Sequence, residues 1–267
     1  MFLENNEIIE NKYVGDRYYL MKVKSNKSWE KSKAGQFFML KNKNEMLILR
    51  RPISLHNVDR ENQILEFYYE VKGKGTVEFS NMKVGETINI QGPLGNGFTT
   101  DVENKTVVVI GGGMGIAPTK LLINELKEKN KVIFIGGGRD KGAVKILENL
   151  DLDGVKVIVT TDDGSEGIKG NVVTALKEVL QNEKIDLIQT CGPQGMMEAI
   201  GKVALENNIE CELSLEERMA CGVKACVGCS IKTLDGMKRV CHDGPVFDGK
   251  IIVDMNPSEN IGCSCGK

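Results

Sequence analysis

From residue 106 onward, short apolar runs alternate with longer stretches in which apolar residues recur at helical spacing. Apolar runs of this length predict buried strands, and their alternation with helices predicts a parallel sheet with crossover helices. The expected strands are 106–111, 131–136, 155–161 and 186–191, and the expected helices are 119–130, 171–181 and 195–207. We therefore expect an α/β nucleotide-binding domain over residues 101–212.

The preceding part of the chain has a different pattern, in which β-branched and aromatic runs are separated by Gly, Asn and Asp. Strands at this spacing predict a small antiparallel β-barrel. The expected strands are 18–25, 36–41, 47–58, 64–72 and 86–91, and the polar stretch 99–105 is the expected linker. The chain should therefore be a multi-domain protein whose barrel domain covers residues 1–100.

Composition narrows the classes of function. The 267 residues include 35 Lys and Arg against 37 Asp and Glu, which gives a formal charge of −2. Such a chain has no overall basic field to hold nucleic acid or an anionic membrane. The longest apolar run is too short to cross a bilayer, and residues 1–10 are acidic where a signal peptide would be basic and then apolar. We expect a cytoplasmic protein that binds small polar ligands.

Four of the eight cysteines are clustered in the sequence. Cys221, Cys226, Cys229 and Cys241 follow the pattern C-x4-C-x2-C-x11-C, and the first two gaps are those of plant-type [2Fe–2S] proteins. A zinc site with four thiolates is the alternative, although zinc ribbons pair two short C-x2-4-C hooks. The spacing favours an iron–sulfur cluster in a small lobe over residues 213–267.

Two more predictions concern this lobe. Ser214 and Glu217 have the S-x-x-E spacing of a capping box, so we expect a short helix that begins there and delivers Cys221 at its far end. Cys263 and Cys265 lie in the tail, where exposed thiols are the simplest expectation.

A glycine-rich turn joins the strand 106–111 to the helix expected after Pro118. A turn of this kind exposes backbone N–H groups at a helix N-terminus, which suits a pyrophosphate. Pro118 stands where a full G-x-G-x-x-G fingerprint would have its third glycine. Arg139 and Asp140 follow the next strand and leave open whether the nucleotide is NAD or NADP. The glycines predicted to contact the nucleotide are Gly111, Gly112, Gly113 and Gly115.

In the barrel half, the sequence Arg-Pro-Ile-Ser at residues 51–54 places a guanidinium and a hydroxyl near a proline-stiffened turn. This combination is able to hold a diphosphate, and an ordinary strand end is the other interpretation. The chain has only two histidines, His56 and His242, which leaves little material for a Rieske centre, a zinc protease or a Ser-His triad.

Several motifs in order along the chain resemble those of one family. They are residues 51–54, 92–98, 111–118, 191–193, 214–222 and 241–247. Together they resemble the ferredoxin-reductase-like flavoproteins and, within them, the electron transfer subunits of NAD-dependent dihydroorotate dehydrogenases, which act in pyrimidine biosynthesis. The likeness covers nearly the whole chain.

The resemblance implies a set of ligands and partners. It implies [2Fe–2S] ligation by the four clustered cysteines, NAD as the diffusible co-substrate, and an FMN-containing catalytic subunit as partner in a heterotetramer of two plus two. No residue of this chain need then act as an acid or base on dihydroorotate. It implies FAD contacts at Arg51, Pro52, Ile53, Ser54, Tyr68, Tyr69, Glu70, Gly75 and Thr76, and a nicotinamide-side role for Cys191, Gly192 and Pro193.

One position departs from the family, because Glu70 stands where a basic residue is expected. Two other functions compete with the one implied. The first is a reductase subunit of related architecture that passes NAD(P)H electrons to ferredoxin, a sulfur-reducing partner or a hydrogenase. The second is a non-enzymatic zinc-binding scaffold.

Overall fold

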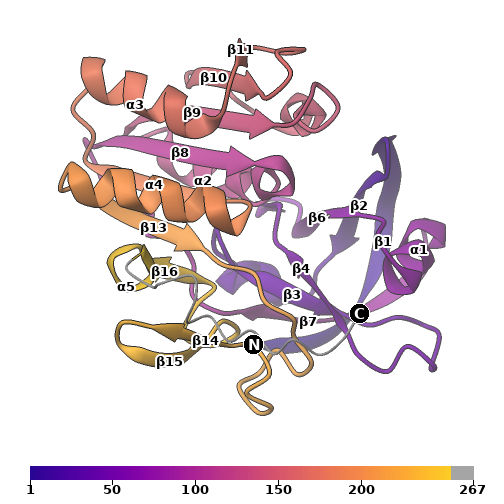
Figure 1. Ribbon diagram of the computed structural model, residues 1–267. Helices are drawn as coiled ribbons and strands as arrows, with labels where there is room; N and C mark the ends of the chain where they lie inside the picture. Colours follow the sequence, from indigo (N-terminus) through magenta and orange to yellow (C-terminus); the bar gives the residue numbers. More distant parts are fainter. Residues whose placement is uncertain (254–267) are drawn as a thin grey trace.

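The structure is a computed structural model that describes residues 1–253, in which two seven-stranded sheets and a small hairpin form the framework (Figure 1). The first sheet is antiparallel throughout, in the order β4-β3-β7-β1-β2-β6-β5. It curls into a half-barrel, so that β4 contacts β6. Its strands are β1 (Phe2–Gly15), β2 (Tyr18–Lys24), β3 (Phe37–Leu40), β4 (Arg51–Ser54), β5 (Asn57–Asp59), β6 (Ile64–Glu70) and β7 (Thr87–Leu94).

The predicted antiparallel domain is confirmed, with two differences in its strands. β1 was missed because half of its residues are charged or amide side chains and its apolar residues come in adjacent pairs, so the alternation typical of a strand is absent. The expected strand 47–58 is wrong as one element: the structure has β4 and β5, and residues 47–50 lie outside both. The short 3-10 helix η1 (Ser28–Lys31) and the helix α1 (Lys74–Asn81), which follows β6, were also not predicted.

The second sheet confirms the predicted parallel α/β domain. Its order is β11-β10-β9-β8-β12-β13-β16, and only β16 is antiparallel to its neighbour. Its strands are β8 (Thr106–Gly112), β9 (Lys131–Gly138), β10 (Lys156–Thr161), β11 (Ile168–Lys169), β12 (Leu187–Cys191), β13 (Glu210–Ser214) and β16 (Val246–Asp248); the helices between them are η2 (Gly113–Ile116), α2 (Thr119–Leu126), η3 (Lys145–Asn149), α3 (Val172–Asn182) and α4 (Gln194–Glu206).

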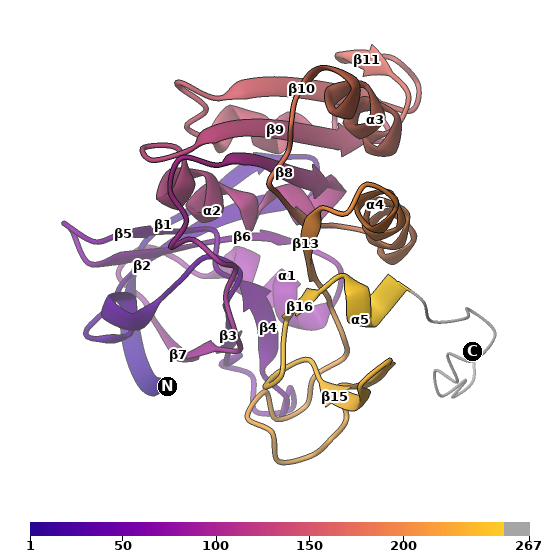
Figure 2. The ribbon, with the colours of Figure 1, turned by 90° about the vertical axis from the view of Figure 1, so that its left-hand side faces the viewer.

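Alternation along the central strands explains the two layers of helices. In β8, Val107 and Val109 pack with α2, whereas Val108 and Ile110 pack with α3 and α4 on the opposite face. The view in Figure 2 shows α3 and α4 on one side of this sheet and α2 on the side of the half-barrel. The second domain therefore rests on the first through α2, which contacts β5.

The cysteine-rich segment is anchored on the second sheet. β16 extends the sheet at β13, the hairpin of β14 (Ser230–Thr233) and β15 (Gly236–Arg239) lies beside it, and the short helix α5 (Lys250–Val253) follows β16. The helix expected from Ser214 is wrong. Ser214 is buried as the last residue of β13, paired with Cys191 on one side and Val246 on the other, so sheet pairing takes the place of a helix cap.

None of the helices within residues 1–253 is long and apolar enough to span a membrane. The first sheet ends at Leu94 and the second begins at Thr106, while the domain limits drawn at residues 100 and 212 stay a prediction. Cys263 and Cys265 lie outside the described residues.

Candidate cofactor and electron transfer site

The guanidinium of Arg51 packs against the first turn of α1. A methyl group added to Gly75 would overlap the Arg51 Nε atom, so the guanidinium can lie this close only because Gly75 has no side chain. Asn42 donates to the Gly75 carbonyl at 2.9 Å, while its Oδ1 atom is buried without a hydrogen-bond partner. The Thr76 hydroxyl accepts from the backbone N–H of Lys72 at 2.9 Å. A fixed cation beside a helix N-terminus fits a diphosphate.

Tyr68 and Tyr69 point to opposite faces of β6. Tyr69 lies in the half-barrel interior, stacked on Tyr19 at 5.8 Å and edge-on to Phe79 at 6.2 Å. Tyr68 lies on the face toward the second domain, with its ring 5.6 Å from that of His56. Burial raises the pKa of both phenols, so both stay protonated. Tyr68 is thus on the same side of β6 as α2, and Tyr69 is a core residue.

The negative charge of Glu70, the residue that departs from the family, is balanced by cations of the same chain. Its carboxylate pairs with Arg17 Nε at 2.5 Å and with Lys72 Nζ at 2.7 Å, and its side chain is nearly buried. Two cations thus surround the one acidic residue at this position. The negative charge of Glu70 is therefore not presented alone to an anionic ligand.

The glycine-rich turn after β8 packs against the turn after β12. Gly111 and Cys191 are register partners in neighbouring strands, and a methyl group on Gly115 would overlap the Cys191 carbonyl oxygen. A methyl group added to Gly192 would lie 3.1 Å from the Cα atom of Gly112. In the sheet, β8 lies between β9 and β12, so the strand order changes direction at β8. The two turns therefore lie at the topological switch point, where α/β sheets bind ligands.

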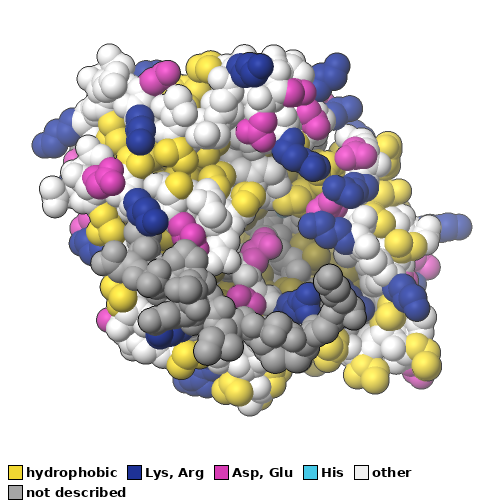
Figure 3. All heavy atoms as spheres, in the orientation of Figure 1, with side chains coloured by type: hydrophobic (Ala, Val, Ile, Leu, Met, Phe, Trp, Pro, Cys, Tyr) yellow, Lys and Arg dark blue, Asp and Glu magenta, His cyan; other side chains and the backbone are white. Residues whose placement is uncertain are grey.

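The surface is hollowed between the carboxyl edge of the second sheet and the half-barrel, with charged side chains around the hollow (Figure 3). Cys191 is buried at the end of β12, and burial raises the pKa of its thiol to about 12, so it stays protonated. Asp140 accepts from the Ala143 backbone N–H at 3.0 Å and thereby caps its own turn, so the choice between NAD and NADP stays open on these residues.

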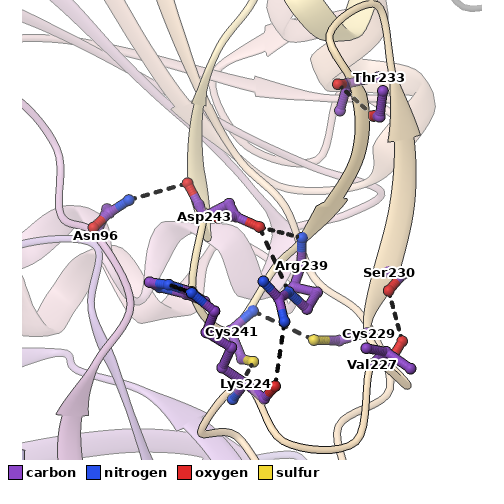
Figure 4. Close-up of polar contacts among 11 residues, drawn as sticks. Asn96, Lys224, Val227, Cys229, Ser230, Thr233, Arg239, Cys241 and Asp243 are labelled. Atoms are coloured by element: carbon purple, nitrogen blue, oxygen red, sulfur yellow. Dashed lines mark hydrogen bonds and ion pairs between the residues drawn. The ribbon is translucent and has the colours of Figure 1, made fainter.

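The four clustered cysteines form two sulfur pairs. The backbone N–H of Cys226 donates to Cys221 Sγ at 3.4 Å, and the backbone N–H of Cys241 donates to Cys229 Sγ at 3.5 Å. Cys229 and Cys241 are buried, Cys221 is half-buried and Cys226 is exposed. In Figure 4 the sulfur of Cys229 points toward Cys241.

Backbone N–H groups surround these sulfurs. Val223 and Cys226 donate to Cys221 Sγ, and Lys224 donates to Cys241 Sγ, each at 3.4 Å. Three residues of the loop have left-handed backbones, and two of them, Lys224 and Val227, are not glycine. Left-handed residues at close spacing turn successive N–H groups inward, as anion-binding loops do.

The electrostatics of the sulfurs follow from these contacts. Burial by itself would raise the pKa of Cys221, but donation from Val223 and Cys226 outweighs it and lowers the pKa to about 7. Burial and the neighbouring Cys229 thiol raise the pKa of Cys241 to about 11. The loop thus favours the thiolate form of Cys221, which is the form that binds a metal.

The positions of the sulfurs bear on the kind of metal centre. A tetrahedral zinc site needs four ligands around one ion. In a [2Fe–2S] cluster each iron takes two cysteine sulfurs, so two adjacent sulfur pairs suffice. The arrangement of sulfurs and N–H donors fits [2Fe–2S].

The cysteine loop packs directly on the first sheet. A methyl group on Gly222 would lie 2.7 Å from Met39 Cγ in β3 and 3.4 Å from a methyl of Leu94 in β7. Met39 is the register partner of Pro52 in β4. One strand therefore separates the loop that carries the cysteines from the segment 51–54.

The motif 92–98 holds the lobe in place. Asn96 donates from its backbone to Gly244 at 2.6 Å and from its side chain to the Asp243 carbonyl at 3.0 Å (Figure 4). A methyl group on Gly95, whose backbone is left-handed, would overlap the ring of Pro245. Sequence reasoning missed Met39 and Asn96 as residues that join the lobe to the first sheet, because the motif 92–98 gave no sign of what Asn96 contacts and Met39 belongs to no motif.

Three features together define a ferredoxin-reductase-like oxidoreductase. They are the half-barrel, the α/β domain with a glycine turn at its switch point, and the sulfur-rich lobe that lies against both. Solved structures agree. The chain aligns to one titled "Insights into flavin-based electron bifurcation via the NADH-dependent reduced ferredoxin-NADP oxidoreductase structure" with a TM-score of 0.82 and 28% identity, over 92% of this chain and 88% of that one. A ferredoxin NADP+ reductase from Neisseria gonorrhoeae with bound FAD and NADP shares the fold, with a TM-score of 0.64 and 18% identity over 76% of this chain and 91% of that one.

Sequence relatives specify the family. Residues 216–253 match the family described as the iron-sulfur cluster binding domain of dihydroorotate dehydrogenase B. The electron transfer subunit of dihydroorotate dehydrogenase B (NAD(+)) from Caldanaerobacter subterraneus is 36% identical over 90% of this chain and 94% of its own length, and that from Streptococcus pneumoniae R6 is 40% identical over 82% and 86%. The chain belongs to the family of electron transfer subunits of NAD-dependent dihydroorotate dehydrogenase B.

Proposed function

We propose that this chain carries electrons from dihydroorotate, oxidised on a separate FMN-containing catalytic subunit, to NAD⁺. When bound, a [2Fe–2S] cluster exchanges single electrons, NAD⁺ takes a pair as hydride, and FAD does both, so the flavin belongs between the other two. The observation that carries the proposal is the contact of Gly222 with Met39, because it places the cysteine loop one strand from the segment 51–54.

The flavin-holding residues would be those of β4 and the start of α1. Arg51 and the N–H groups around Gly75 and Thr76 bind the diphosphate, since a guanidinium and a helix N-terminus converge there. Pro52, Ile53 and Ser54 follow Arg51 in the same strand, β4. Tyr68 closes the site from β6. Tyr69 and Glu70 contribute through the backbone and through packing, because their side chains are committed to the core and to Arg17.

The nucleotide would lie over the two packed turns at the switch point. Gly111, Gly112, Gly113 and Gly115 keep the β8 turn free of side chains, so that backbone N–H groups reach the pyrophosphate. Cys191, Gly192 and Pro193 form the adjoining wall, and the Cys191 thiol is a neutral group there. We propose NAD as the nucleotide, as in the names of the relatives.

The catalytic partner would bind where the cysteine loop is exposed. Val227, Leu234 and Met237 are apolar side chains in this lobe that are each more than half exposed. Val227 lies in the cysteine loop itself, whereas Leu234 and Met237 lie in the β14–β15 hairpin, and exposed apolar side chains of this kind suit a protein partner. We propose that two copies of each subunit form a heterotetramer, and that Cys221, Cys226, Cys229 and Cys241 hold the cluster.

Anaerobic coexpression with a candidate catalytic subunit tests the proposal. The isolated chain should oxidise NADH with an artificial acceptor and leave dihydroorotate unchanged, while the complex should reduce NAD⁺ with dihydroorotate. Turnover of dihydroorotate by this chain alone would contradict the division of labour. Copurification with ferredoxin or a hydrogenase, without an orotate-forming partner, would support the related reductase function instead.

A further inference from the structure

His56 joins the two halves of the proposed active site. It lies two residues after Ser54, between β4 and β5, and is completely buried. Its Nδ1 atom lies 2.6 Å from the carbonyl oxygen of Ala117, at the end of the glycine-rich turn. Its backbone oxygen accepts from the Leu121 N–H at 3.1 Å, in the first turn of α2. The segment that follows the flavin strand is thus bonded to the nucleotide turn by both side chain and backbone.

The surroundings fix the tautomer of His56. A carbonyl oxygen only accepts, so Nδ1 carries the hydrogen and Nε2 does not. Burial lowers the pKa of His56 to about 4, with Lys120 as the next cause. Nε2 is buried without a hydrogen-bond partner. The imidazole therefore acts as a neutral donor to one acceptor, Ala117.

A buried ion pair makes a second connection beside the first. Lys120 Nζ in α2 lies 2.8 Å from Glu66 Oε2 in β6, and both side chains are largely buried. Lys22 also approaches Glu66, at 3.9 Å. The charged groups that face His56 are therefore Lys120, Glu66 and Lys22. Because Gly115 is fixed against Cys191, the turn is held at one end by β12 and at the other by His56.

We propose that His56 is a positioning residue, whose hydrogen bond to Ala117 fixes the nucleotide turn relative to the flavin segment 51–54 and so aligns NAD(H) with the flavin for hydride transfer. This inference rests on the proposed function. A misplacement of reacting groups by about 1 Å can cost on the order of 100-fold in rate. A hydrogen bond that holds the end of the nucleotide turn is thus able to affect the rate without touching the reacting atoms.

Two amide variants of His56 test the proposal as a matched pair. In His56→Asn the amide nitrogen can occupy the place of Nδ1 and donate to Ala117. In His56→Gln the amide reaches the place of Nε2 and the donor to Ala117 is lost. Both are polar and neutral, so burial and charge are closely matched. His56→Leu removes every donor.

The readout is reduction of the bound flavin by NADH in single-turnover experiments on the full chain, with flavin and iron content as controls. His56→Gln and His56→Leu should keep their flavin and slow its reduction at saturating NADH about 10- to 100-fold, while reduction by dithionite is unchanged. His56→Asn should recover most of the wild-type rate. Equal rates in wild type and His56→Gln, or equal losses in His56→Asn and His56→Gln, would overturn the proposal.

Hydrogen exchange of the backbone amides at 113–121 gives a readout that does not need electron transfer. Exchange there should quicken in His56→Gln and stay near wild type in His56→Asn. Unchanged exchange in His56→Gln would overturn the positioning role even if the variants fail in turnover. If the wild-type chain itself is not reduced by NADH, the proposed function is wrong, while the exchange data still decide whether His56 fixes the turn.

Discussion

The glycine-rich turn 111–118 and the cysteine loop 221–229 are both proposed to bind a ligand through backbone N–H groups, but they are built in opposite ways. The turn is buried almost throughout, and its glycines fit against Cys191, Ile116 and Met196. The loop is largely exposed, and its N–H groups already donate to cysteine sulfurs. The turn is shaped by packing, whereas the loop is shaped by the sulfurs.

This difference predicts where each region is sensitive. A region held by packing tolerates the replacement of distant functional groups, but it does not tolerate an added methyl group. A region held by ligand atoms tolerates small changes in volume but not the loss of a sulfur. Each prediction below would break or sharpen this contrast.

Removing one sulfur should have the largest effect. In Cys241→Ser the loop should lose its iron, and turnover of dihydroorotate with the catalytic subunit should vanish, because one iron lacks a ligand. NADH oxidation by an artificial acceptor should remain. Iron analysis and the two assays measure this.

Cys211→Ala is the matched control for the sulfur variant. Cys211 is a buried thiol on β13 outside the four, and it acts there as a small apolar side chain. Its variant should keep iron and both activities. Loss of iron from Cys211→Ala, or retention of iron by Cys241→Ser, would contradict the assignment of ligands.

An added methyl group in the turn should have the next largest effect. Gly115→Ala should lower the free energy of unfolding by about 1–3 kcal/mol, because the new methyl meets the Cys191 carbonyl oxygen, which is backbone and cannot turn away. NADH-dependent reduction should fall with it. In α4, Gly195→Ala meets no atom within 4 Å and should be neutral or stabilising. Thermal unfolding of both variants measures the difference, and equal melting temperatures would contradict the packing account.

These two regions also show how much the sequence predicts. The position of the turn was predictable, because strand, glycines and Pro118 follow one another and the contacts are with the neighbouring strand, while its nucleotide-binding role stays a prediction. The cysteine-rich lobe was predictable from the spacing of its four cysteines, and their role as ligands stays a prediction. The conformation between Ser214 and Cys221 was not, because β13 pairs on both edges and this pairing is set by residues 191 and 246, far away in sequence.

Contacts between domains were the least predictable part. His56, Glu66 and Lys120 belong to no motif, and they are singled out by a hydrogen bond to Ala117 and an ion pair between α2 and β6 that exist only when the two domains meet. β1 was missed for a related reason, since its polar residues form a strand only because β2 and β7 pair with it on either side.

Acid should loosen the end of the turn held by His56. The folded pKa of about 4 lies below the usual 6.5, so the unfolded chain binds the proton more tightly and the folded state loses stability as pH falls from about 6.5 toward 4. At pH 5 this amounts to about 2 kcal/mol. Urea unfolding at pH 7 and pH 5 measures it, with His56→Asn as the variant that lacks the titrating group. The same loss in both proteins would show that other groups cause it.

The smallest effect is expected where the cysteine loop meets the first sheet. Gly222→Ala should lower the free energy of unfolding by about 1 kcal/mol, because its backbone is left-handed, while the flexible Met39 side chain can move aside. Gly228→Ala has no left-handed backbone and meets only Cys226 Sγ at 3.5 Å, so it should be near neutral. The rate of electron exchange between cluster and flavin should fall in Gly222→Ala only. Equal rates in the two variants would remove the Met39 contact from the account.

The central claim is that the sulfur pairs hold a [2Fe–2S] cluster beside a bound flavin. Protein purified without oxygen should contain iron and acid-labile sulfide in equal amounts together with FAD, and should give a paramagnetic signal after reduction with dithionite. Zinc in place of iron, with no signal after reduction, would contradict the claim.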